Sequence, residues 1–554
     1  MMTGARALAE MLHGYGVTHV FMVPAILRRT MAELERFGVH RIGTHGEKPA
    51  AYMADGYARM AGRPGVCMAQ AVGALNLAAG LRDAHLANSP VIAFTGGLHP
   101  TMAGRGVYQE VDDLPAFHNI TKFNTSVDRV NQIPDSIRQA FRSAVSGRPG
   151  PAHVRLAGNE GQIDLEEGDL DPWVERGFAA VPSVRPLPDP QDVTAALDLL
   201  DRAQRPVIVA GGGVRTSRAS DQLTALAERL SIPVVTSLNG KDTIPGAHPL
   251  AVGVVGRYSR SAANRVMNRA DLVCFVGSSA GSMTTHSWQV PSPGIPAIQV
   301  DIDPAMLARN YPLAVSINAD ARMTMAALCE SAGRRDPGRS EWLAEVRREV
   351  TDWREQHRRH LESDAAPIRP ERICRELGAV APDDACVVVD TGHAGMWMGA
   401  MFDTRTPTQS YLRSAGHLGW AFPASLGAKC AAPDRPVICF TGDGGFWYHI
   451  AEVETAVRWN INTVTVVNNN SSGNQSTIGF DRAYGGRQTP EGRRLWTFTD
   501  VDFAGLSEGM GAMGIRVTRP DRLRPALERA LEAECPVVVD VVTDIEALAP
   551  LPVV

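Results

Sequence analysis

The sequence lacks several features that mark whole classes of protein. It has no run of 18 apolar residues, and so no segment with the length and apolarity of a membrane-spanning helix. Its 55 Lys and Arg stand against 60 Asp and Glu, and the net charge of -5 gives no sign of a partnership with nucleic acid or an acidic membrane. Its glycines and prolines form no low-complexity block. What remains is the composition of a globular enzyme.

Paired cysteines are also missing. The eight cysteines never form a C-x-x-C pair, and most lie in apolar patterns such as V-I-C-F and L-V-C-F. We expect buried, inert thiols, as suits a reducing compartment. The first residues, M-M-T-G-A-R-A-L-A-E-M-L, are typical of the start of an amphipathic helix and not of a signal peptide. We therefore expect a cytoplasmic protein.

What the chain does have is one pattern repeated three times. Short β-branched runs end in Gly-rich turns and are followed by helical periodicity, and 554 residues are too many for a single core. Strands that are apolar throughout and alternate with helices are typical of parallel sheets covered on both faces. We predict an α/β fold with three doubly wound parallel-sheet domains. Their expected bounds are 1–165, 190–335 and 368–554.

Two stretches are predicted to connect these domains. Residues 161–190 are acidic and rich in proline, which suits a linker. Residues 334–369 begin R-R-D-P-G-R-S and continue as a highly charged helical segment over 341–359. Mixed charge on a helix usually marks a face in contact with water, so we expect a solvated connector.

In the third block, an acid between glycines and a run of three asparagines each follow a predicted strand. V-I-C-F-T precedes G-D-G-G at 442–445, with a helix expected from about 450 to 459, and T-V-T-V-V precedes N-N-N at 468–470. The tips of parallel strands meet at one edge of a sheet, so we expect Asp443 and Asn470 to lie together.

These two side chains would supply a carboxylate and an amide oxygen. With a nearby backbone carbonyl they make the kind of oxygen-only site that Mg²⁺ occupies together with phosphate and water. Gly442, Gly444 and Gly445 would let the backbone approach phosphates closely. Taken singly, the two motifs are equally typical of an ordinary turn and an ordinary loop.

Glu47 is a second candidate. It follows the strand-like H-R-I-G-T and opens the small-residue helix A-A-Y-M-A-D-G-Y-A. An acid at a helix start is common because the helix dipole favours it, so a purely structural role is the alternative.

Together, motifs along almost the whole chain resemble those of thiamine diphosphate (ThDP)-dependent enzymes, specifically the acetolactate synthase-like (acetohydroxyacid synthase large-subunit-like) family. The matching stretches are G-E-K-P-A-A-Y-M-A-D-G-Y-A-R-M-A-G-R-P-G-V-C, G-R-G-V-Y-Q-E-V-D with I-T-K-F-N, R-P-V-I-V-A-G-G-G-V with I-P-V-V-T-S-L-N-G-K, and G-H-L-G-W-A-F-P-A-S-L-G-A-K with G-D-G and N-N-N. The resemblance implies that the three domains are the aminopyrimidine-binding (Pyr), middle and diphosphate-binding (PP) domains.

The resemblance also implies a role for each matched residue. Glu47 would protonate N1′ of the aminopyrimidine, and Asp443, Asn470 and the backbone oxygen of Ser472 would bind Mg²⁺. The other implied contacts are Gly392 and His393 with the diphosphate, the Gly416 carbonyl with the 4′-amino group, Leu418 as a wedge between the cofactor rings, and Gln109 in the Gln-Glu segment as a catalytic residue.

The implied chemistry explains why a glutamate is needed. A buried glutamate that shares a proton with N1′ drives the pyrimidine to its imino form, whose nitrogen is then a base beside C2 of the thiazolium. In enzymes of this kind the two cofactor-holding domains come from different subunits. A homodimer or homotetramer with sites at the subunit interface is therefore implied.

The chain departs from the family pattern at several places. The usual Gly-Pro-Gly reads A-V-G at 71–73, and the stretch after the asparagines reads S-S-G-N-Q-S-T-I-G-F with no tryptophan. His417 and Tyr108 replace a Thr and a Phe. We therefore expect a more polar substrate pocket, with these residues converging on it: Tyr108, Gln109, His417, Asn474 and Gln475.

The middle block leaves a second cofactor open. G-G-G at 211–213 and V-D-I-D at 300–303 fall where the family contacts a flavin, while V-G-S-S-A-G-S-M-T-T-H-S-W replaces its Arg-containing flavin segment. A Gly-rich turn is weak evidence by itself. FAD, ADP and no ligand at all are the three alternatives.

Three functions follow as hypotheses. The first is a ThDP- and Mg²⁺-dependent transferase or lyase that forms or cleaves a C–C bond in a small 2-oxo acid or ketone, most simply a carboligase. The second is a 2-oxo-acid decarboxylase, or a lyase or hydrolase of a larger or cyclic diketone, which the polar Asn474–Gln475 pair motivates. The third is a non-catalytic regulator or scaffold, and the intact Glu47, Asp443 and Asn470 speak against it.

Overall fold

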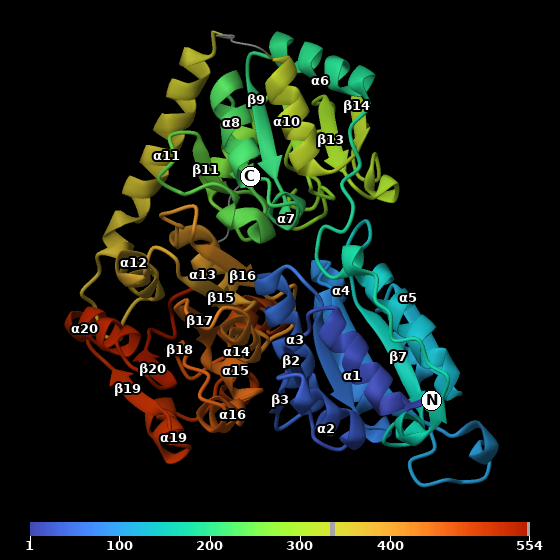
Figure 1. Ribbon diagram of the computed structural model, residues 1–554. Coiled ribbons are helices and arrows are strands. Elements are labelled where there is room, and N and C mark those ends of the chain that lie inside the picture. The colour runs from blue at the N-terminus through green and yellow to red at the C-terminus, as the bar shows by residue number, and fades with distance from the viewer. Residues whose placement is uncertain (333–337, 551–554) are drawn as a thin grey trace.

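The computed structural model describes residues 1–332 and 338–550. Three domains are arranged so that the first and third lie side by side below the middle one in the view of Figure 1. Parts of three predicted segments lie outside the described residues: the end of the middle domain, the start of the linker 334–369, and the last four residues of the third domain.

The first domain is built on a parallel sheet of six strands in the order β3-β2-β4-β5-β7-β6. In that order the strands are His40–Gly43, His19–Met22, Gly65–Ala69, Val91–Gly97, Ala152–Ala157 and Phe123–Val127. Its helices are α1 (Gly4–Gly14), α2 (Arg28–Arg36), α3 (Glu47–Ala61), α4 (Ala74–Ala87) and α5 (Ile133–Val145). A short antiparallel pair, β1 (Met2–Thr3) with β8 (Glu167–Gly168), lies beside α1.

The middle domain repeats this plan with the strand order β11-β10-β9-β12-β13-β14. In that order the strands are Ala251–Val254, Val234–Thr236, Pro206–Ala210, Leu272–Val276, Ala297–Asp301 and Val315–Asn318. Its helices are α6 (Pro190–Arg202), α7 (Gly212–Thr216), α8 (Ser220–Leu230), α9 (Ser261–Asn268) and α10 (Ala321–Ser331).

The third domain has the order β16-β15-β17-β18-β20-β19. In that order the strands are Ser410–Arg413, Cys386–Val389, Val437–Gly442, Val464–Asn469, Val537–Val542 and Met513–Val517. Its helices are α12 (Pro370–Val380), α13 (His393–Met401), α14 (Ala421–Ala431), α15 (Asp443–Trp447), α16 (Glu452–Arg458), α17 (Thr477–Ala483), α18 (Pro490–Arg493), α19 (Phe503–Gly509) and α20 (Pro520–Leu531). The helix expected at about 450 to 459 is α16.

The prediction of three doubly wound parallel sheets is confirmed. The central strands are apolar throughout because helices cover both faces of each sheet, and every residue of β4, β9, β12 and β15 is buried. In the third sheet the chain reverses its direction of travel between β15 and β17. The turns that follow these two strands therefore meet at one edge, where parallel α/β sheets bind their ligands.

The first and third domains are in backbone contact through α3 and α14. A Cβ at Gly56 would overlap the carbonyl oxygen of Ala424, and a Cβ at Gly427 would overlap that of Met53. Only glycine permits this approach. As a result the helix that begins with Glu47 packs closely against the helix that follows the predicted cofactor residues Gly416 and Leu418.

The charged segment after the middle domain forms α11 (Ser340–Leu361). One of its faces is buried, since Trp342 and Val346 pack in the core of the middle domain and Trp353 in the core of the third. Arg260 lies over the Trp353 ring at 4.7 Å. The helix is therefore attached to two domains, and the prediction of a solvated connector is wrong for this face.

The cysteines stand largely as predicted. All eight are unpaired; five are buried and three are half-buried. Burial raises the pKa of Cys274 to about 12, which keeps its thiol protonated and unreactive. Within the described ranges, the helices include none with both the length and the apolarity to cross a membrane.

Candidate active site

The first cluster of predicted residues lies at the edge of the third sheet, where β17 and β18 end. Asp443 directly follows β17, is the first residue of α15, and is buried. Its Oδ2 accepts the Ser472 N–H at 2.9 Å, and the Ser472 hydroxyl donates to Asn470 Oδ1, also at 2.9 Å. The structure thus links the two predicted side chains through Ser472.

The electrostatics of this corner favour a cation. Burial raises the pKa of Asp443 to about 7, against the effect of the N–H groups of Gly444 and Ser472 that donate to it. Asn469 donates to Asp540 at 2.9 Å and so belongs to the supporting fold. The described part of the chain has no cluster of three or more His, Cys, Asp or Glu side chains placed for a metal. Mg²⁺ would therefore have one charged ligand here and would share phosphate oxygens, which its preference for oxygen ligands allows.

A second cluster lies at the turn after β15. Gly392, with φ of 70°, precedes α13, and a Cβ there would lie 2.7 Å from Gln475 Oε1 and 3.7 Å from Leu418 Cδ2. Leu418 is 44% exposed, so an apolar side chain projects beside this turn. Gln475 is also exposed, and its Nε2 donates to the hydroxyl of Tyr258 in the middle domain at 3.2 Å.

Next to this cluster, the half-buried His393 is paired with the buried Asn474. His393 Nδ1 and Asn474 Oδ1 are 2.7 Å apart, and the Asn474 amide donates to the carbonyls of Ile545 and Ala547 at 3.1 Å each. Burial lowers the pKa of His393. The structure therefore divides the predicted polar pair. Gln475 lies at the surface of the site, whereas Asn474 holds His393 and the C-terminal segment.

Gly416 and His417 lie on a loop that the first domain holds. Asp83 of α4 accepts the N–H of Gly416 at 3.1 Å and that of His417 at 3.2 Å, and His417 Nδ1 lies 3.2 Å from the same carboxylate. Across residues 1–332 and 338–550, no donor reaches the Gly416 carbonyl. It is thus left as a free acceptor beside Leu418. Asp83 was not among the predicted residues, because an acid inside a helix gives no signal in the sequence.

Glu47 is the first residue of α3, in the first domain. The Asn76 amide donates to Glu47 Oε2 at 3.2 Å, and a Cβ at Gly73 would overlap Glu47 Oε1. Gln109 Oε1 accepts from Gln70 Nε2 at 3.2 Å, so Gln109 lies beside the turn that carries Gly73. The departure from the family pattern at 71–73 thus keeps the one glycine that Glu47 requires.

Within one chain the predicted residues form two separate groups. We call Glu47 and Gln109 the first-domain half-site, and Asp443, Asn470, Ser472, Gly392, Gly416 and Leu418 the third-domain half-site. Among the residues described, no hydrogen bond or ion pair joins Glu47 to the third-domain half-site. Tyr108 is 78% exposed. The predicted convergence of five polar residues on one pocket is therefore not seen inside a single chain.

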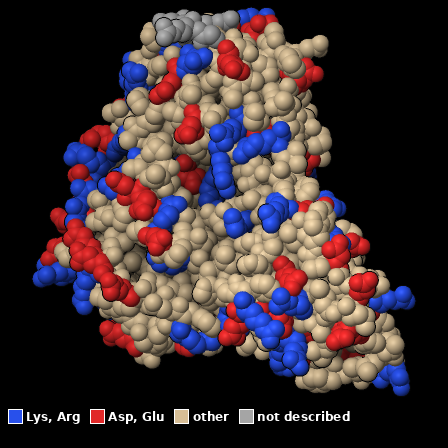
Figure 2. All heavy atoms as spheres, viewed as in Figure 1, with Lys and Arg blue, Asp and Glu red and all other residues tan. Residues whose placement is uncertain are grey.

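A cavity of about 560 Å³ lies where the middle domain meets the other two. A Cβ at Gly211 would overlap the Gly277 carbonyl oxygen and one at Gly213 would overlap its Cα, so these two glycines are needed for packing. In the described structure, the buried polar atoms of cavity-lining residues without a hydrogen-bond partner include Arg413 Nε and Tyr411 Oη. Figure 2 shows Lys and Arg side chains gathered near this junction. A basic cavity with an unpaired guanidinium suits an anionic ligand.

Family models match the chain in three consecutive parts. All three describe thiamine pyrophosphate enzymes: the N-terminal TPP binding domain over residues 2–116, the central domain over 193–328 and the C-terminal TPP binding domain over 390–541. The two half-sites fall within or directly beside the first and last of these parts.

Relatives match along the full length. The probable acetolactate synthase large subunit of Methanocaldococcus jannaschii is 33% identical, with 100% of this chain and 94% of the relative covered. The acetolactate synthase large subunit of Corynebacterium glutamicum is 31% identical over 99% of this chain and 87% of its own length. The putative thiamine pyrophosphate-containing protein YdaP of Bacillus subtilis is 29% identical over 99% and 93%. The chain therefore belongs to the thiamine pyrophosphate-dependent enzymes, in the acetolactate synthase-like family.

Proposed function

We propose that this enzyme uses ThDP and Mg²⁺ to join a 2-oxo acid to a carbonyl acceptor, as a carboligase of the acetolactate synthase type. The observation that carries the proposal is the link between Asp443 and Asn470 through Ser472 at the edge of the third sheet. Full-length similarity to proteins named acetolactate synthase large subunit supports it.

The third-domain half-site would hold the charged end of the cofactor. Asp443, Asn470 and the Ser472 backbone oxygen would bind Mg²⁺, while Gly392 and His393 would receive the diphosphate beside them. Asn474 would position the His393 ring, because its Oδ1 lies 2.7 Å from His393 Nδ1. The backbone of Gly442, Gly444 and Gly445 carries no side chain that would keep phosphates away.

The rings would lie between the two half-sites. When bound, ThDP supplies an electron sink, which takes up the negative charge that develops on the carbon atom of the reacting carbonyl. Leu418 would separate the two rings, the free Gly416 carbonyl would accept from the 4′-amino group, and Glu47 would hold a proton at N1′. Gln109 and His417 would then face the substrate from opposite sides.

A second copy of the chain would complete each site, in a homodimer or homotetramer. The support is that, among the described residues, no hydrogen bond or ion pair joins Glu47 to the third-domain half-site of its own chain, although both half-sites carry intact residues. The first-domain half-site of one subunit would therefore face the third-domain half-site of its partner.

The direct test is product analysis with ThDP and Mg²⁺ saturating. A carboligase fed with pyruvate alone should release carbon dioxide and form a coupled hydroxyketo acid, and an added aldehyde should give a mixed product. Free aldehyde with no coupled product would instead indicate a decarboxylase. Cleavage of a cyclic diketone would indicate the lyase or hydrolase alternative. No turnover of any of these compounds would contradict the proposal.

We expect Gln475 to influence substrate choice and not cofactor activation. It is exposed beside Gly392 and contacts Tyr258, and in the described structure it forms no hydrogen bond with Asp443, Asn470 or Ser472. Gln475→Leu keeps the size and removes the polar head, so kcat/KM for the preferred acceptor should change about tenfold. Deuterium exchange at C2 of bound ThDP should stay within about twofold of the wild type.

The control for this variant is Gln356→Leu on the exposed face of α11, which should leave both values unchanged. If exchange fell as far as turnover in Gln475→Leu, Gln475 would belong to the cofactor site and the assignment to substrate choice would be wrong.

The cavity of the middle domain would take an adenine nucleotide such as ADP or FAD. The unpaired Nε of Arg413 and hydroxyl of Tyr411 in its wall support this, because buried polar atoms ordinarily find a partner. The diphosphate that ADP and FAD share would provide one.

Arg413→Met should therefore weaken ADP binding by at least about tenfold, the scale of one charge-assisted hydrogen bond. Calorimetry with ADP and FAD measures the effect. Arg494→Met changes an exposed arginine of the third domain and should leave binding unchanged. Wild-type protein that bound neither compound would contradict the nucleotide proposal without touching the ThDP site.

Two further expectations remain proposals. The domain bounds 1–165, 190–335 and 368–554 enclose each sheet, from β2 to β7, from β9 to β14 and from β15 to β20. A cytoplasmic location is supported by the eight unpaired thiols, which persist in a reducing compartment.

A further inference from the structure

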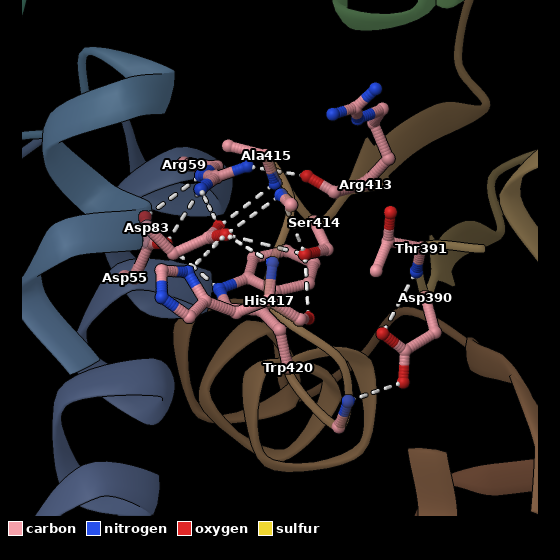
Figure 3. Close-up of polar contacts among 12 residues, drawn as sticks. Asp55, Arg59, Asp83, Asp390, Thr391, Arg413, Ser414, Ala415, His417 and Trp420 are labelled. Atoms are coloured by element: carbon pink, nitrogen blue, oxygen red, sulfur yellow. Dashed lines mark hydrogen bonds and ion pairs between the residues drawn. The ribbon is translucent and has the colours of Figure 1, made fainter. Parts of the chain in front are cut away.

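The loop 414–420, which carries Gly416 and Leu418, is held almost entirely by carboxylates. Asp83 accepts the N–H groups of Ala415 at 3.0 Å, Gly416 at 3.1 Å and His417 at 3.2 Å. Asp390, directly after β15, accepts the N–H of Gly419 at 2.9 Å. Successive N–H groups that converge on one anion form an anion-binding concavity, and here a side chain of the same protein fills it. The sticks in Figure 3 show this arrangement.

A second layer fixes Asp83. Arg59 donates to Asp83 at 3.1 Å, to Asp55 at 2.6 Å and to the carbonyl of Arg413 at 2.7 Å. Asp55 accepts the indole N–H of Trp420 at 2.8 Å, and the guanidinium of Arg59 lies 4.5 Å from the centre of that ring. The side chains of Asp55 and Asp83 are fully buried.

The groups around Asp83 stabilise its buried negative charge. Burial alone would raise the pKa of Asp83, but the hydrogen bond with His417 and the charge of Arg59 hold it at about 2. The carboxylate therefore stays ionised and can only accept hydrogen bonds. It follows that His417 Nδ1 carries a proton toward Asp83.

The loop is left with few free groups. Its N–H groups at 415, 416, 417 and 419 are all engaged by Asp83 or Asp390. The Gly416 carbonyl has no donor in the described structure, and the Leu418 side chain is 44% exposed. These are the two groups that the proposed function places against the cofactor rings.

We propose that Asp83, supported by Arg59, is the positioning residue for the loop 414–420. It belongs to the first domain, so the first domain of each chain aligns the cofactor loop of its own third domain. The same carboxylate orients the imidazole of His417, which stands where the family has a threonine. This inference rests on the proposed function, because it assigns a consequence for ThDP activation.

The test uses the full-length protein with ThDP and Mg²⁺. In Asp83→Asn an NH₂ group replaces one of the two carboxylate oxygens and faces other donors. If it replaces Oδ2, it faces the N–H groups of Ala415 and Arg59; if it replaces Oδ1, it faces those of Gly416 and His417. The loop should shift, and a displacement of about 1 Å in such a site can cost 10²-fold in rate. We expect deuterium exchange at C2 to slow by about tenfold to 10²-fold at saturating ThDP. The dissociation constant of ThDP should change by less than about threefold, since Asp443 holds the other end of the cofactor.

The matched control is Asp164→Asn. Asp164 is also a buried carboxylate of the first domain, and it accepts the N–H and hydroxyl of Thr30 at 3.1 and 2.9 Å, away from the loop. This variant should melt earlier and yet exchange C2 deuterium at the wild-type rate. A merely structural Asp83 would behave in the same way, so wild-type exchange in Asp83→Asn at saturating ThDP would overturn the inference.

A gentler variant covers the case in which Asp83→Asn does not fold. The Ser414 hydroxyl lies 3.2 Å from Asp83 Oδ1 and donates to the His417 carbonyl at 2.8 Å. Ser414→Ala should slow exchange several-fold, and an unchanged rate would overturn the inference. Wild-type protein that binds ThDP and does not exchange C2 deuterium would instead sink the proposed function, which is a distinguishable result.

Discussion

Glu47→Gln is expected to slow deuterium exchange at C2 of bound ThDP by at least about 10²-fold, within the ~10²–10⁴-fold range of general acid–base catalysis. The amide keeps the size of the side chain and its position beside Asn76 and Gly73, but it cannot hold and release a proton at N1′. The variant should fold and still bind ThDP. Exchange is read by NMR after acid quench.

The competing interpretation treats Glu47 as a helix-start acid, worth ~0.3–1 kcal/mol of stability. Under it the variant would melt slightly earlier and exchange at the normal rate, and that pattern would falsify the role proposed for Glu47. Glu341→Gln is the matched control, because Glu341 occupies the first turn of α11 far from either half-site. It should alter stability alone.

Asp443→Ala is expected to weaken ThDP binding in the presence of Mg²⁺ by more than about 10²-fold. Even residues that only support metal ligands typically account for 10–100-fold in metal affinity, and Asp443 would be the only charged ligand. Without it, the diphosphate loses its bridge to the third sheet. Calorimetry or near-UV circular dichroism measures the binding. Asp521→Ala, which removes an exposed first-turn acid of α20, should leave it intact.

Normal affinity in Asp443→Ala would show that Mg²⁺ does not bind at this corner. Coexpression of Asp443→Ala with Glu47→Gln chains then tests the assembly. If each site combines half-sites from two subunits, a mixed dimer has one site with both changes and one with neither, and activity returns. If each site lay within one chain, the mixture would be as inactive as its components.

The metal corner could be predicted because it follows from local pattern and sheet geometry. β17 and β18 are apolar runs bounded by Gly and Asn, and parallel neighbours must end at the same edge. Asp443 and Asn470 are 27 positions apart, but the pairing of the two strands brings them to one serine. Gly392 follows β15 at the same edge, but it was predicted only from the resemblance to the family.

Three of the edge strands lack the apolar pattern that marks β17 and β18. The edge strands β6, β14 and β19 are mostly half-buried or exposed and carry no continuous apolar run. The buried face of α11 was overlooked, although Trp342, Val346 and Trp353 recur at helical spacing among its charges. Here a signal existed, and the abundance of charge outweighed it in the prediction.

The sequence by itself therefore determined the three sheets, the family, and the residue types at both half-sites, because periodicity and strand-end motifs act over a few residues. Only the tertiary structure decided that Asn474 turns inward to His393 and Ala547 and that Asp83 holds a loop more than 330 positions away. Those contacts join segments from different elements. The packing of α3 against α14 brings Asp83 and the loop 414–420 together. The role of a buried carboxylate depends on which hydrogen-bond donors surround it. Neither residue spacing nor composition predicts where those donors lie.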